Sequence, residues 1–303
     1  MLIEVAAAGV NFADVMATMG LYPAAPKPPC VLGYEVAGTI TAVGDGVSQL
    51  AVGQRAVAAT RFGGYTSQLV VPAADIVPLP DGMSFEQGAA FPVNYATAWT
   101  ALHGYGCLQA GERVLIHAAA GGVGTAATQL ATDAGAEIWG TASPAKHEAI
   151  RGHGVAHPID YTRSGWQREL PKFDLVLDAI GGRSLSRSYK LLRAGGRLVA
   201  YGASSVVTGE RRNLRAAAQM FLSTPRFNVI SQMTASKAVI GLNMLALWDD
   251  RGTLGPWLDP LQVGLENGTV HPVVAASFPF ERAADAHRML LERRNVGKVV
   301  LVP

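Results

Sequence analysis

The sequence is poor in cysteine and in charge. Its 303 residues include two cysteines, Cys30 and Cys107, which excludes a disulfide framework and a cysteine-rich zinc lobe. Charged residues make up 16% of the chain, below the usual share of about 25%, and 25 Lys+Arg nearly balance 23 Asp+Glu. This composition argues against disorder and against a nucleic-acid interface. It favours a globular protein of the reducing cytoplasm.

The sequence also lacks an uninterrupted apolar run long enough for a membrane span. Two stretches, 87–111 and 114–132, carry no Asp, Glu, Lys or Arg. Pro92 interrupts the first, and Gln129 with several glycines interrupts the second, whereas a spanning helix needs about 20 predominantly apolar residues. The N-terminus has no basic residue and an early Glu4, so it predicts a strand and not a signal peptide. We expect no integral membrane segment.

The middle of the chain alternates short β-rich apolar runs with helical stretches. This alternation predicts parallel strands joined by right-handed crossovers, which is a doubly wound α/β sheet. The predicted strands are 114–120, 137–143, 157–161, 173–182 and 197–205, and the predicted helices are 125–136, 144–151, 164–170 and 184–196.

The two flanks have a different pattern. Residues 1–80 are rich in Gly, Val and Pro and contain short strands with turn signals, which predicts a small antiparallel, barrel-like domain. A capping box at Ser84–Gln87 starts one helix, and a second helix is expected over 94–103. The C-terminal part, 270–302, returns to mixed α+β character. The pattern leaves open whether this part joins the first domain.

A glycine-rich turn carries the strongest chemical signal. It follows a buried strand, opens a helix and reads Ala118-x-x-Gly121-Gly122-Val123-Gly124. In that setting glycines let the backbone approach a pyrophosphate, while the helix N-terminus supplies N–H groups and a partial positive charge. We interpret the turn as an A-x-x-G-x-x-G variant of the dinucleotide fingerprint, with Gly121 to Gly124 as cofactor contacts. The alternative is a turn that serves only helix-to-sheet packing.

The residues after the next strand indicate which dinucleotide binds. An NAD site places Asp or Glu about 20 residues after the glycines, but 140–147 holds no acid and offers Ser143 and Lys146. A hydroxyl and a fixed cation suit a 2′-phosphate, so NADPH is preferred over NADH. Tyr161, at the end of the following strand, is a further candidate contact. The plainer alternatives are a solvated Lys146 and a half-buried Tyr161.

Several separated segments form motifs that occur in a known order. They are GVNFADVMATMGLYP (9–23), PCVLGYEVAGTITAVGDGV (29–47), VNYATAW (93–99), HAAAGGVG (117–124), GTASPAKHEAIRGHGVAHPIDY (140–161), VVTGERRNL (206–214) and NVGKVVLVP (295–303). Together they resemble the medium-chain dehydrogenase/reductase superfamily, in its quinone oxidoreductase (zeta-crystallin-like) branch. Within that branch they are most similar to the vesicle amine transport protein homologues.

The resemblance implies how the domains are connected. It implies a GroES-like catalytic domain from residues 1–93 plus 236–303, with a Rossmann dinucleotide-binding domain, 94–235, inserted between these parts. Family members usually carry a further strand pair before the segment that begins here at Leu2. We therefore expect an unpaired strand edge near the N-terminus.

Three positions depart from the zinc-dependent relatives within the superfamily. Where those enzymes place zinc ligands, this chain has Asn11, Tyr34 and Val93, which do not form a zinc site. The pair His153 and His157 has no third ligand and is interpreted as part of a loop. We expect no bound metal, and therefore an acceptor that needs little activation.

The resemblance and the residues together predict an NADPH-dependent, zinc-independent reductase of quinones or α,β-unsaturated carbonyls, acting in a cleft between the domains. The resemblance implies Asn11 as a contact to the nicotinamide ribose or substrate, with Tyr22 as the nearest hydrogen-bond donor to the substrate. It also places Thr97, Ser204 and Lys298 near the cofactor. The alternatives are a turn asparagine, a loop aromatic residue and, for Lys298, a plain charge on an edge strand.

Two other functions stay open, together with a quaternary structure. The first is the enoyl-thioester reduction step of a lipid or polyketide pathway. The second is an NADPH-binding interaction protein with little catalysis, although no polybasic cluster or lipidation motif supports a membrane role. The resemblance implies a homodimer that pairs through the last strand of the Rossmann sheet, which would lie in the apolar run 238–244.

Overall fold

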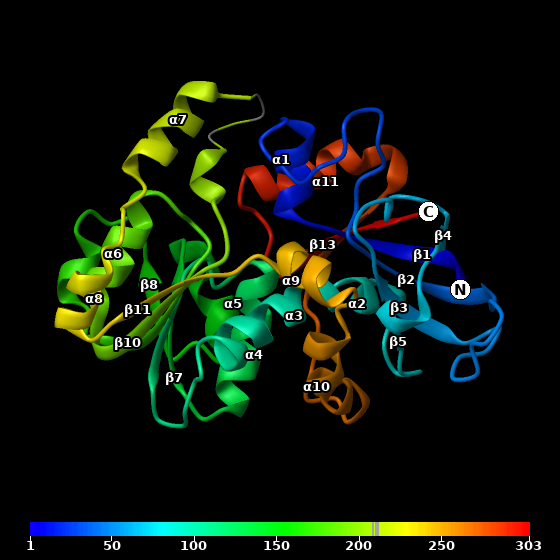
Figure 1. Cartoon of the computed structure of the whole chain (residues 1–303), viewed down its shortest axis with the longest axis horizontal. Coiled ribbons are helices and arrows are strands. Elements are labelled where there is room, and N and C mark those ends of the chain that lie inside the picture. The colour runs from blue at the N-terminus through cyan, green and yellow to red at the C-terminus, as the bar shows by residue number, and fades with distance from the viewer. Residues whose placement is uncertain (208, 210–211) are drawn as a thin grey trace. The chain divides into compact units, whose positions relative to one another are not determined.

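The computed structural model describes residues 1–207, 209 and 212–303, so residues 208, 210 and 211 of the 206–214 motif lie outside the description. The chain forms two compact units (Figure 1). Unit 1 contains Met1–Ala96 and Met244–Pro303, and unit 2 contains Thr97–Asn243. The insertion therefore ends at residue 243, beyond the predicted boundary at 235, because the strand at 238–241 pairs with the sheet of unit 2.

Unit 1 is built on a 7-stranded sheet. Its order is β12-β13-β1-β2-β3-β5, and β4 also pairs with β1. The pairs are antiparallel except β12 with β13, which are parallel. The strands are β1 (Leu2–Val10), β2 (Glu35–Ala42), β3 (Arg55–Ala59), β4 (Gln68–Val70), β5 (Ile76–Pro78), β12 (Val274–Pro279) and β13 (Lys298–Val302). The C-terminal segment thus joins the first one, as the resemblance implied.

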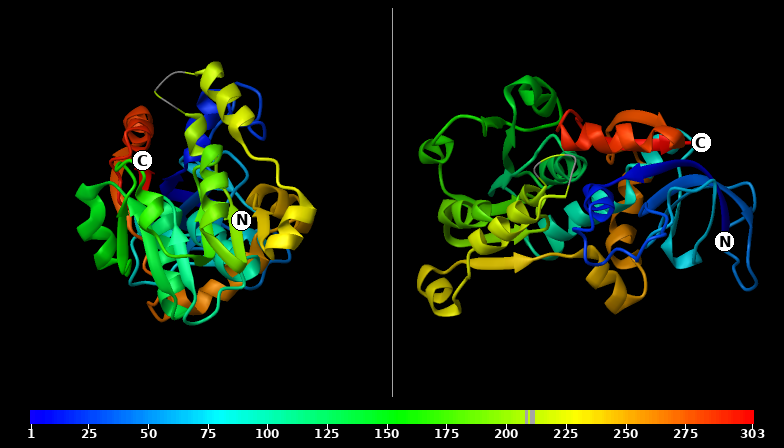
Figure 2. Two further views of the ribbon diagram at one scale, coloured as in Figure 1. Left: turned by 90° about the vertical axis from the view of Figure 1, so that its left-hand side faces the viewer. Right: turned by 90° about the horizontal axis from the view of Figure 1, so that it is seen from above.

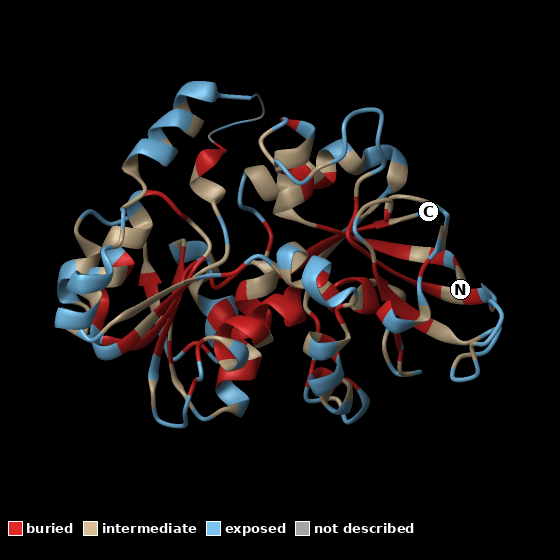
Figure 3. Ribbon diagram, in the orientation of Figure 1, coloured by how far each residue is buried: buried red, intermediate tan, exposed pale blue. Residues whose placement is uncertain are grey.

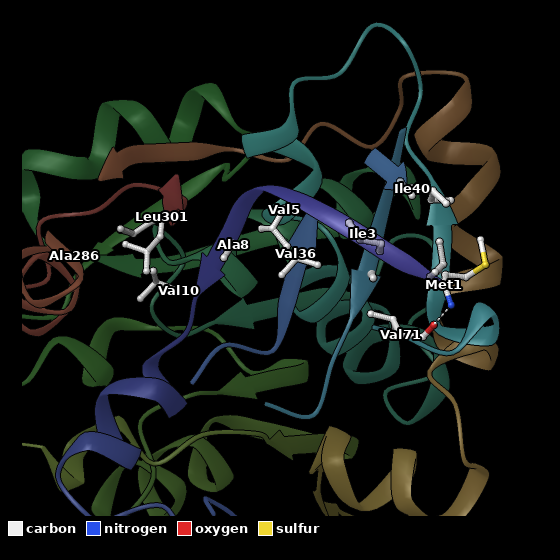
Figure 4. Packing of buried hydrophobic residues seen from close by; sticks show 14 residues of the cluster. Met1, Ile3, Val5, Ala8, Val10, Val36, Ile40, Val71, Ala286 and Leu301 are labelled. Atoms are coloured by element: carbon white, nitrogen blue, oxygen red, sulfur yellow. Dashed lines mark hydrogen bonds between the residues drawn. The ribbon is translucent and has the colours of Figure 1, made fainter. Parts of the chain in front are cut away.

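The core of unit 1 lies on β1 and its neighbours. Ile3, Val5 and Val10 of β1 pack with Val36 of β2 and Leu301 of β13 (Figure 4). Helix α11 (Ala283–Leu291) packs against β12 and β13 (Figure 2). The other helices assigned to this unit are α1 (Phe12–Thr18), α2 (Phe85–Ala89), α9 (Met244–Arg251) and α10 (Gly255–Glu266), and α3 (Pro92–Trp99) crosses the boundary.

The N-terminal strand is paired along both sides. Leu2 to Glu4 pair with β2 on one side and with β4 on the other, and Ala8 to Val10 pair with β13. The terminal amine of Met1 donates to the carbonyl oxygen of Val71 over 3.0 Å. The expected unpaired edge at β1 is therefore wrong, because β4 and β13 occupy that edge.

Unit 2 holds a 6-stranded, parallel sheet of order β11-β10-β9-β6-β7-β8. This is the strand order of a Rossmann fold. The chain adds β7 and β8 on one side of β6 and then β9, β10 and β11 on the other side. The strands are β6 (Arg113–Ile116), β7 (Glu137–Ala142), β8 (His157–Asp160), β9 (Phe173–Asp178), β10 (Leu192–Ala200) and β11 (Ala238–Gly241). The predicted doubly wound α/β class is confirmed.

The helices of unit 2 follow the predicted alternation with two exceptions. The helix predicted over 184–196 ends at Leu191, because Leu192–Ala200 already forms β10, so the strand predicted over 197–205 begins and ends earlier than expected. Helices α4 (Gly122–Asp133) and α5 (His147–Gly152) pack on β6, β7 and β8, while α6 (Arg183–Leu191) packs on β9 and β10. The helix predicted over 164–170 is only a short 3-10 helix, Trp166–Glu169. The stretch begins with Ser164-Gly165, and Gly165 has a left-handed conformation, which stops an α-helix from starting earlier.

Two further helices, α7 (Leu214–Ser223) and α8 (Val229–Ala235), contain no buried residue and are exposed in Figure 3. Their exposed apolar side chains are Leu214, Phe221, Leu222, Val229, Ile230 and Met233. Within the described part of the chain, none of the helices is both long and apolar enough to cross a bilayer.

Candidate functional site

The turn between β6 and α4 has a strained first residue. Ala118 stands at the fingerprint's first glycine position and adopts φ 54, a left-handed conformation that costs an L-residue about 1–2 kcal/mol. Its backbone N–H donates to Thr141 Oγ1 over 3.1 Å, and its carbonyl oxygen accepts from the N–H of Gly121 over 2.9 Å. One hydrogen bond to β7 and one within the turn therefore hold Ala118 in a conformation that a glycine would adopt without strain.

The glycines of the turn have different tasks. A Cβ on Gly124 would lie 2.3 Å from the carbonyl oxygen of Ala118, so this glycine is required for helix-to-strand packing. Gly121 is the N-cap of α4 and offers no side-chain oxygen to the N–H groups of the first turn. Those N–H groups and the helix dipole can bind an anion. Packing thus accounts for Gly124, while the start of α4 keeps the groups that a pyrophosphate needs.

The candidate residues for the 2′-phosphate lie at one edge of the sheet. Ser143 directly follows β7, and Lys146 ends the 3-10 helix Pro144–Lys146. Tyr161 directly follows β8, whose Asp160 pairs with Ala142 of β7. Parallel strands present their carboxyl ends at the same edge, so the sheet brings these three side chains to one side. All three are half-buried.

The loops after β9 and β10 complete this edge. Ser204 donates its N–H to the carbonyl oxygen of Ala179 over 3.1 Å. Its neighbour Ser205 has a buried hydroxyl without a hydrogen-bond partner among the described residues. An unsatisfied buried hydroxyl is costly unless a ligand or water pairs with it. Together with the open helix start, Ser205 indicates that this edge fits a polar dinucleotide.

Asp178, at the end of β9, supports this loop, although no sequence motif pointed to it. Its carboxylate accepts from the N–H groups of Ile180 and Gly181 and from the hydroxyls of Ser184 and Ser188. His117 Nε2 lies 3.0 Å from Ser188 Oγ. Burial lowers the pKa of His117, against the opposing charge of Asp178. Because these side chains form hydrogen bonds with one another and with the loop backbone, we infer that they stabilise the loop after β9.

Unit 1 contains a buried charged cluster. Lys298 of β13 is 3% exposed and pairs with Glu35 of β2, which is fully buried. The Lys298 ammonium also donates to Asn11 Oδ1 over 2.6 Å, and Asn11 Nδ2 donates to Glu35 Oε1 over 3.0 Å. Since β13 lies between β12 and β1, the alternative of Lys298 as a plain edge-strand charge is wrong. The alternative that Asn11 is only a turn residue fits its backbone, which is the N-cap of α1, but does not explain why its side chain binds Lys298 and Glu35.

A second buried carboxylate holds the backbone around this cluster. Asp14 accepts from the N–H groups of Asn11 (2.8 Å) and Gly33 (3.0 Å) and from the Tyr65 hydroxyl (3.1 Å). Burial raises the pKa of Asp14 to about 6, although the hydrogen bonds from Asn11 and Gly33 oppose the rise. Tyr65 also lies 3.3 Å from His287 Nε2, and burial lowers the pKa of that histidine.

Glu35 links two of the three positions at which the zinc-dependent relatives carry ligands, Asn11 and Val93. Its second oxygen accepts from the N–H of Val93 over 2.7 Å, while its first pairs with Asn11 and Lys298. Tyr34, the neighbouring residue, packs its ring against Phe62 with centroids 4.8 Å apart. Among the described residues, no group of three or more His, Cys, Asp or Glu side chains could hold a metal ion.

Comparison with known proteins identifies the family. Residues 1–81 match the alcohol dehydrogenase GroES-like domain, and residues 153–301 match the zinc-binding dehydrogenase domain. The human synaptic vesicle membrane protein VAT-1 homolog is 39% identical over 98% of this chain and 77% of its own length. The chain belongs to the medium-chain dehydrogenase/reductase superfamily.

Two solved structures of this superfamily's fold cover almost the whole chain. The CurK enoyl reductase superposes with a TM-score of 0.84 at 30% identity, covering 99% of this chain and 90% of that one. The quinone oxidoreductase from Thermus thermophilus, solved also as a complex with NADPH, superposes with a TM-score of 0.80 at 32% identity, covering 100% and 91%. This member of the superfamily is therefore similar in fold and sequence to oxidoreductases of two substrate classes.

The predicted site residues of this superfamily member fall into both units. Asn11, Tyr22 and Lys298 belong to unit 1, and Thr97, Gly121 to Gly124, Ser143, Lys146, Tyr161 and Ser204 belong to unit 2. The structure joins Asn11 to Lys298 directly. Thr97 is buried at the first position of unit 2. Glu35, Asp14 and Tyr65 were not among the predicted site residues, because their importance follows only from contacts between distant segments.

Proposed function

We propose that this protein is a zinc-independent reductase that uses NADPH to reduce quinones or α,β-unsaturated carbonyls. The observation that carries the proposal is the start of α4, where a glycine N-cap leaves N–H groups for a pyrophosphate. Ser143 and Lys146 follow β7 at the position where an NAD site has an acid. The match to a quinone oxidoreductase with an NADPH complex supports the same cofactor.

Different residues of unit 2 would contact different parts of the dinucleotide. Gly121, Gly122, Val123 and Gly124 would hold the pyrophosphate, and Ser143, Lys146 and Tyr161 would hold the adenosine phosphate. Ser204 and Thr97 would lie toward the nicotinamide. When bound, NADPH supplies a hydride, so that acceptor, NADPH and one proton give reduced acceptor and NADP⁺.

The residues at the positions of the zinc ligands limit which classes of acceptor the protein could reduce. An amide, a phenol and an aliphatic side chain at Asn11, Tyr34 and Val93 do not provide the ligands that hold catalytic zinc. An isolated alcohol or ketone therefore has no Lewis acid here. Quinones and conjugated enones accept hydride without one, because the developing negative charge is delocalised over a phenolate or an enolate and is not localised on an alkoxide oxygen.

The charged cluster of unit 1 fixes the groups that would meet the acceptor. Lys298 and Glu35 hold both polar atoms of the Asn11 amide, so Asn11 would be pre-oriented toward the nicotinamide ribose or the substrate. Tyr22 would donate a hydrogen bond to the oxygen on which charge develops. The task of the chain is then to position the reactants and to stabilise that oxygen.

The decisive experiment measures NADPH oxidation by the purified protein with a panel of acceptors. The panel holds an ortho-quinone, a para-quinone, an aliphatic enone and an enoyl thioester, and each is repeated with NADH. We expect turnover of a quinone or the enone with preference for NADPH. Binding of NADPH without oxidation by any acceptor would contradict the enzymatic proposal and favour an interaction protein.

Lys146→Ala sharpens the cofactor assignment. Loss of the cation beside the 2′-phosphate is expected to raise the Kd for NADPH about tenfold, which corresponds to about 1.4 kcal/mol, and to leave the Kd for NADH unchanged. Arg151→Ala, on the exposed end of α5, is the matched control. Equal losses for both cofactors in Lys146→Ala would show that Lys146 does not read the phosphate.

An enoyl-thioester reductase is the second candidate, because specific relatives favour it. Polyketide synthase GfsB from Streptomyces halstedii is 37% identical over 99% of this chain, which corresponds to 5% of that synthase, and CurK is an enoyl reductase. Turnover of the enoyl thioester with a kcat/KM above that of every quinone would select this function. Both candidates use the same cofactor residues.

We also propose a homodimer of the cytoplasm that pairs through β11. This strand is an edge of the sheet in unit 2, and the exposed apolar residues of α8 immediately precede it. A second copy would pair the edge and cover those side chains. Sedimentation should give a dimer that Met233→Glu weakens, whereas a monomeric wild type would refute the assembly.

A further inference from the structure

Tyr34 has a buried hydroxyl that forms no hydrogen bond of normal geometry. The residue is 5% exposed, and among the described residues its Oη comes close only to Tyr22, near enough for a side-chain hydrogen bond between the two phenols to contribute to both pKa values. A phenylalanine would fill the same space without burying an unpaired hydroxyl, and such a hydroxyl keeps the full cost of its desolvation. The hydroxyl therefore points to a partner that it meets during function.

The backbone around Tyr34 is held on both sides. Asp14 accepts from the N–H of Gly33, and the carbonyl oxygen of Tyr34 accepts from the N–H of Thr60 over 2.7 Å. Gly33 has φ 98, and a Cβ there would lie 2.7 Å from the Tyr65 ring. Glu35, the next residue, is fixed by Lys298 and Val93. These bonds hold the backbone of Tyr34 in place, so the partner of its hydroxyl is a group that lies beside it.

The polar side chain that faces Tyr34 is Tyr22. The two rings meet edge to face, with centroids 6.4 Å apart and planes at 84°. Tyr22 is half-buried on the loop after α1, whereas the other ring against Tyr34 belongs to Phe62, which has no polar atom in its side chain. Tyr22 is thus both the neighbour of the unpaired hydroxyl and the side chain with access to an acceptor.

We propose that Tyr34 is a positioning residue for Tyr22, whose phenol oxygen accepts a hydrogen bond from the buried Tyr34 hydroxyl while Tyr22 donates to the acceptor's carbonyl oxygen. A donor whose own oxygen accepts a hydrogen bond becomes a better donor, because the two bonds polarise each other. Tyr34 transfers no proton in this role. For its catalytic consequence the inference rests on the proposed function.

The electrostatics of the pair agree with these directions. Burial raises the pKa of Tyr22, a side-chain hydrogen bond from Tyr34 opposes the rise, and the charge of Asp14 adds to it. Burial also raises the pKa of Tyr34, and the neighbouring Tyr22 and Asp14 contribute in the same direction. Tyr34 therefore stays protonated throughout the range of an assay, as a donor must.

The first test needs no turnover. NMR of protein labelled with ¹³C at tyrosine Cζ follows the titration of Tyr22, whose signal is assigned by its absence in Tyr22→Phe. In Tyr34→Phe we expect the pKa of Tyr22 to rise by about half a unit to one unit, since one hydrogen bond to its oxygen is lost. Tyr189→Phe, a change in unit 2, is the control. An unchanged pKa in Tyr34→Phe overturns the proposal.

The second test asks whether Tyr34 acts through Tyr22. Tyr34→Phe should lower kcat about three- to tenfold while KM changes less than about twofold, and it should have no further effect in a Tyr22→Phe background. Equal losses in both backgrounds would mean that Tyr34 acts independently, which overturns the pairing. If the wild type reduces none of the acceptors, the proposed function fails, and the NMR titration alone decides the tyrosine pair.

Discussion

The two candidate sites are built in opposite ways. The glycine-rich turn of the Rossmann unit is one continuous stretch, Ala118 to Gly124, and the groups that it offers are backbone N–H groups. The charged cluster of the GroES-like unit joins Asn11 and Lys298, which are 287 residues apart in sequence, and it acts through side chains. The first therefore depends on local conformation, and the second depends on the register of the sheet.

This difference predicts different sensitivities to mutation. A backbone site tolerates a change of side chain unless the new atoms collide with the turn. A buried cluster of charges does not, because removal of one partner leaves another charge without compensation. Four changes test this contrast, from the largest expected effect to the smallest.

Lys298→Met should have the largest effect. It leaves the buried Glu35 carboxylate without its ion-pair partner and removes the donor to Asn11 Oδ1. We expect a loss of about 3–5 kcal/mol in the free energy of unfolding, measured by urea denaturation. The double variant Lys298→Met/Glu35→Gln should recover part of this loss, since the unpaired charge is gone. If the single variant unfolds like the wild type, the cluster contributes nothing to stability.

Gly124→Ala should have the next largest effect, and it tests the steric limit of the backbone site. The new Cβ would lie 2.3 Å from the carbonyl oxygen of Ala118, so α4 must shift away from the strand. We expect a loss of about 2–3 kcal/mol and weaker NADPH binding by calorimetry. Gly152→Ala is the control in the same unit, because a Cβ there meets no atom within 4 Å. Equal effects of the two variants would refute the packing argument.

The third prediction concerns pH and the carboxylate behind the charged cluster. Because burial raises the pKa of Asp14 to about 6, the folded protein binds more protons than the unfolded chain between about pH 4 and 6. Asp14 therefore makes the free energy of unfolding fall as the pH rises through that window, by up to about 2–3 kcal/mol. This contribution is present below about pH 4 and lost above about pH 6.

The measurement has to separate Asp14 from the histidines. Burial lowers the pKa of His117 and of His287, and a buried neutral histidine makes stability rise with pH over part of the same range. We therefore compare the pH slope of the wild type with that of Asp14→Asn, in which only the Asp14 contribution is removed. The wild type should have the more negative slope between about pH 4 and 6. Identical slopes would mean that Asp14 titrates as an exposed carboxyl.

Much of the fold could be predicted from the sequence, because periodicity and turn chemistry act locally. The alternating strands and helices predicted the parallel sheet, and the Ser84–Gln87 capping box is present, with Gln87 N–H donating to Ser84 Oγ. The end of the insertion was predicted inconsistently. The resemblance set the boundary at 235 but also expected 238–244 to be the last strand of the Rossmann sheet, and the pairing of Ala238–Gly241 with β10 decides for the second expectation.

The residues of the candidate site also differ in whether a local sequence pattern could predict them. Gly121 to Gly124 were found from the chain's own pattern, whereas Asn11 and Lys298 were found by resemblance and their bond was not foreseen. Asp14 and Tyr65 gave no signal, since an aspartate in a first helical turn is ordinary and a loop tyrosine is common. Their meaning arises when the fold brings them to within 3.1 Å of each other.

Ala118→Gly should have the smallest effect, and it tests whether the variant fingerprint is a handicap. Glycine would release the strain of the left-handed φ of 54, about 1–2 kcal/mol, but it also adds about 0.4–1 kcal/mol of backbone entropy to the unfolded chain. We expect a net gain of between about 0 and 1.6 kcal/mol in thermal unfolding and an unchanged Kd for NADPH. A marked loss of NADPH affinity would show that the Ala118 methyl group contacts the cofactor. Such a result would mean that the turn also binds the cofactor through a side chain. The turn and the charged cluster would then differ only in how much each relies on side chains.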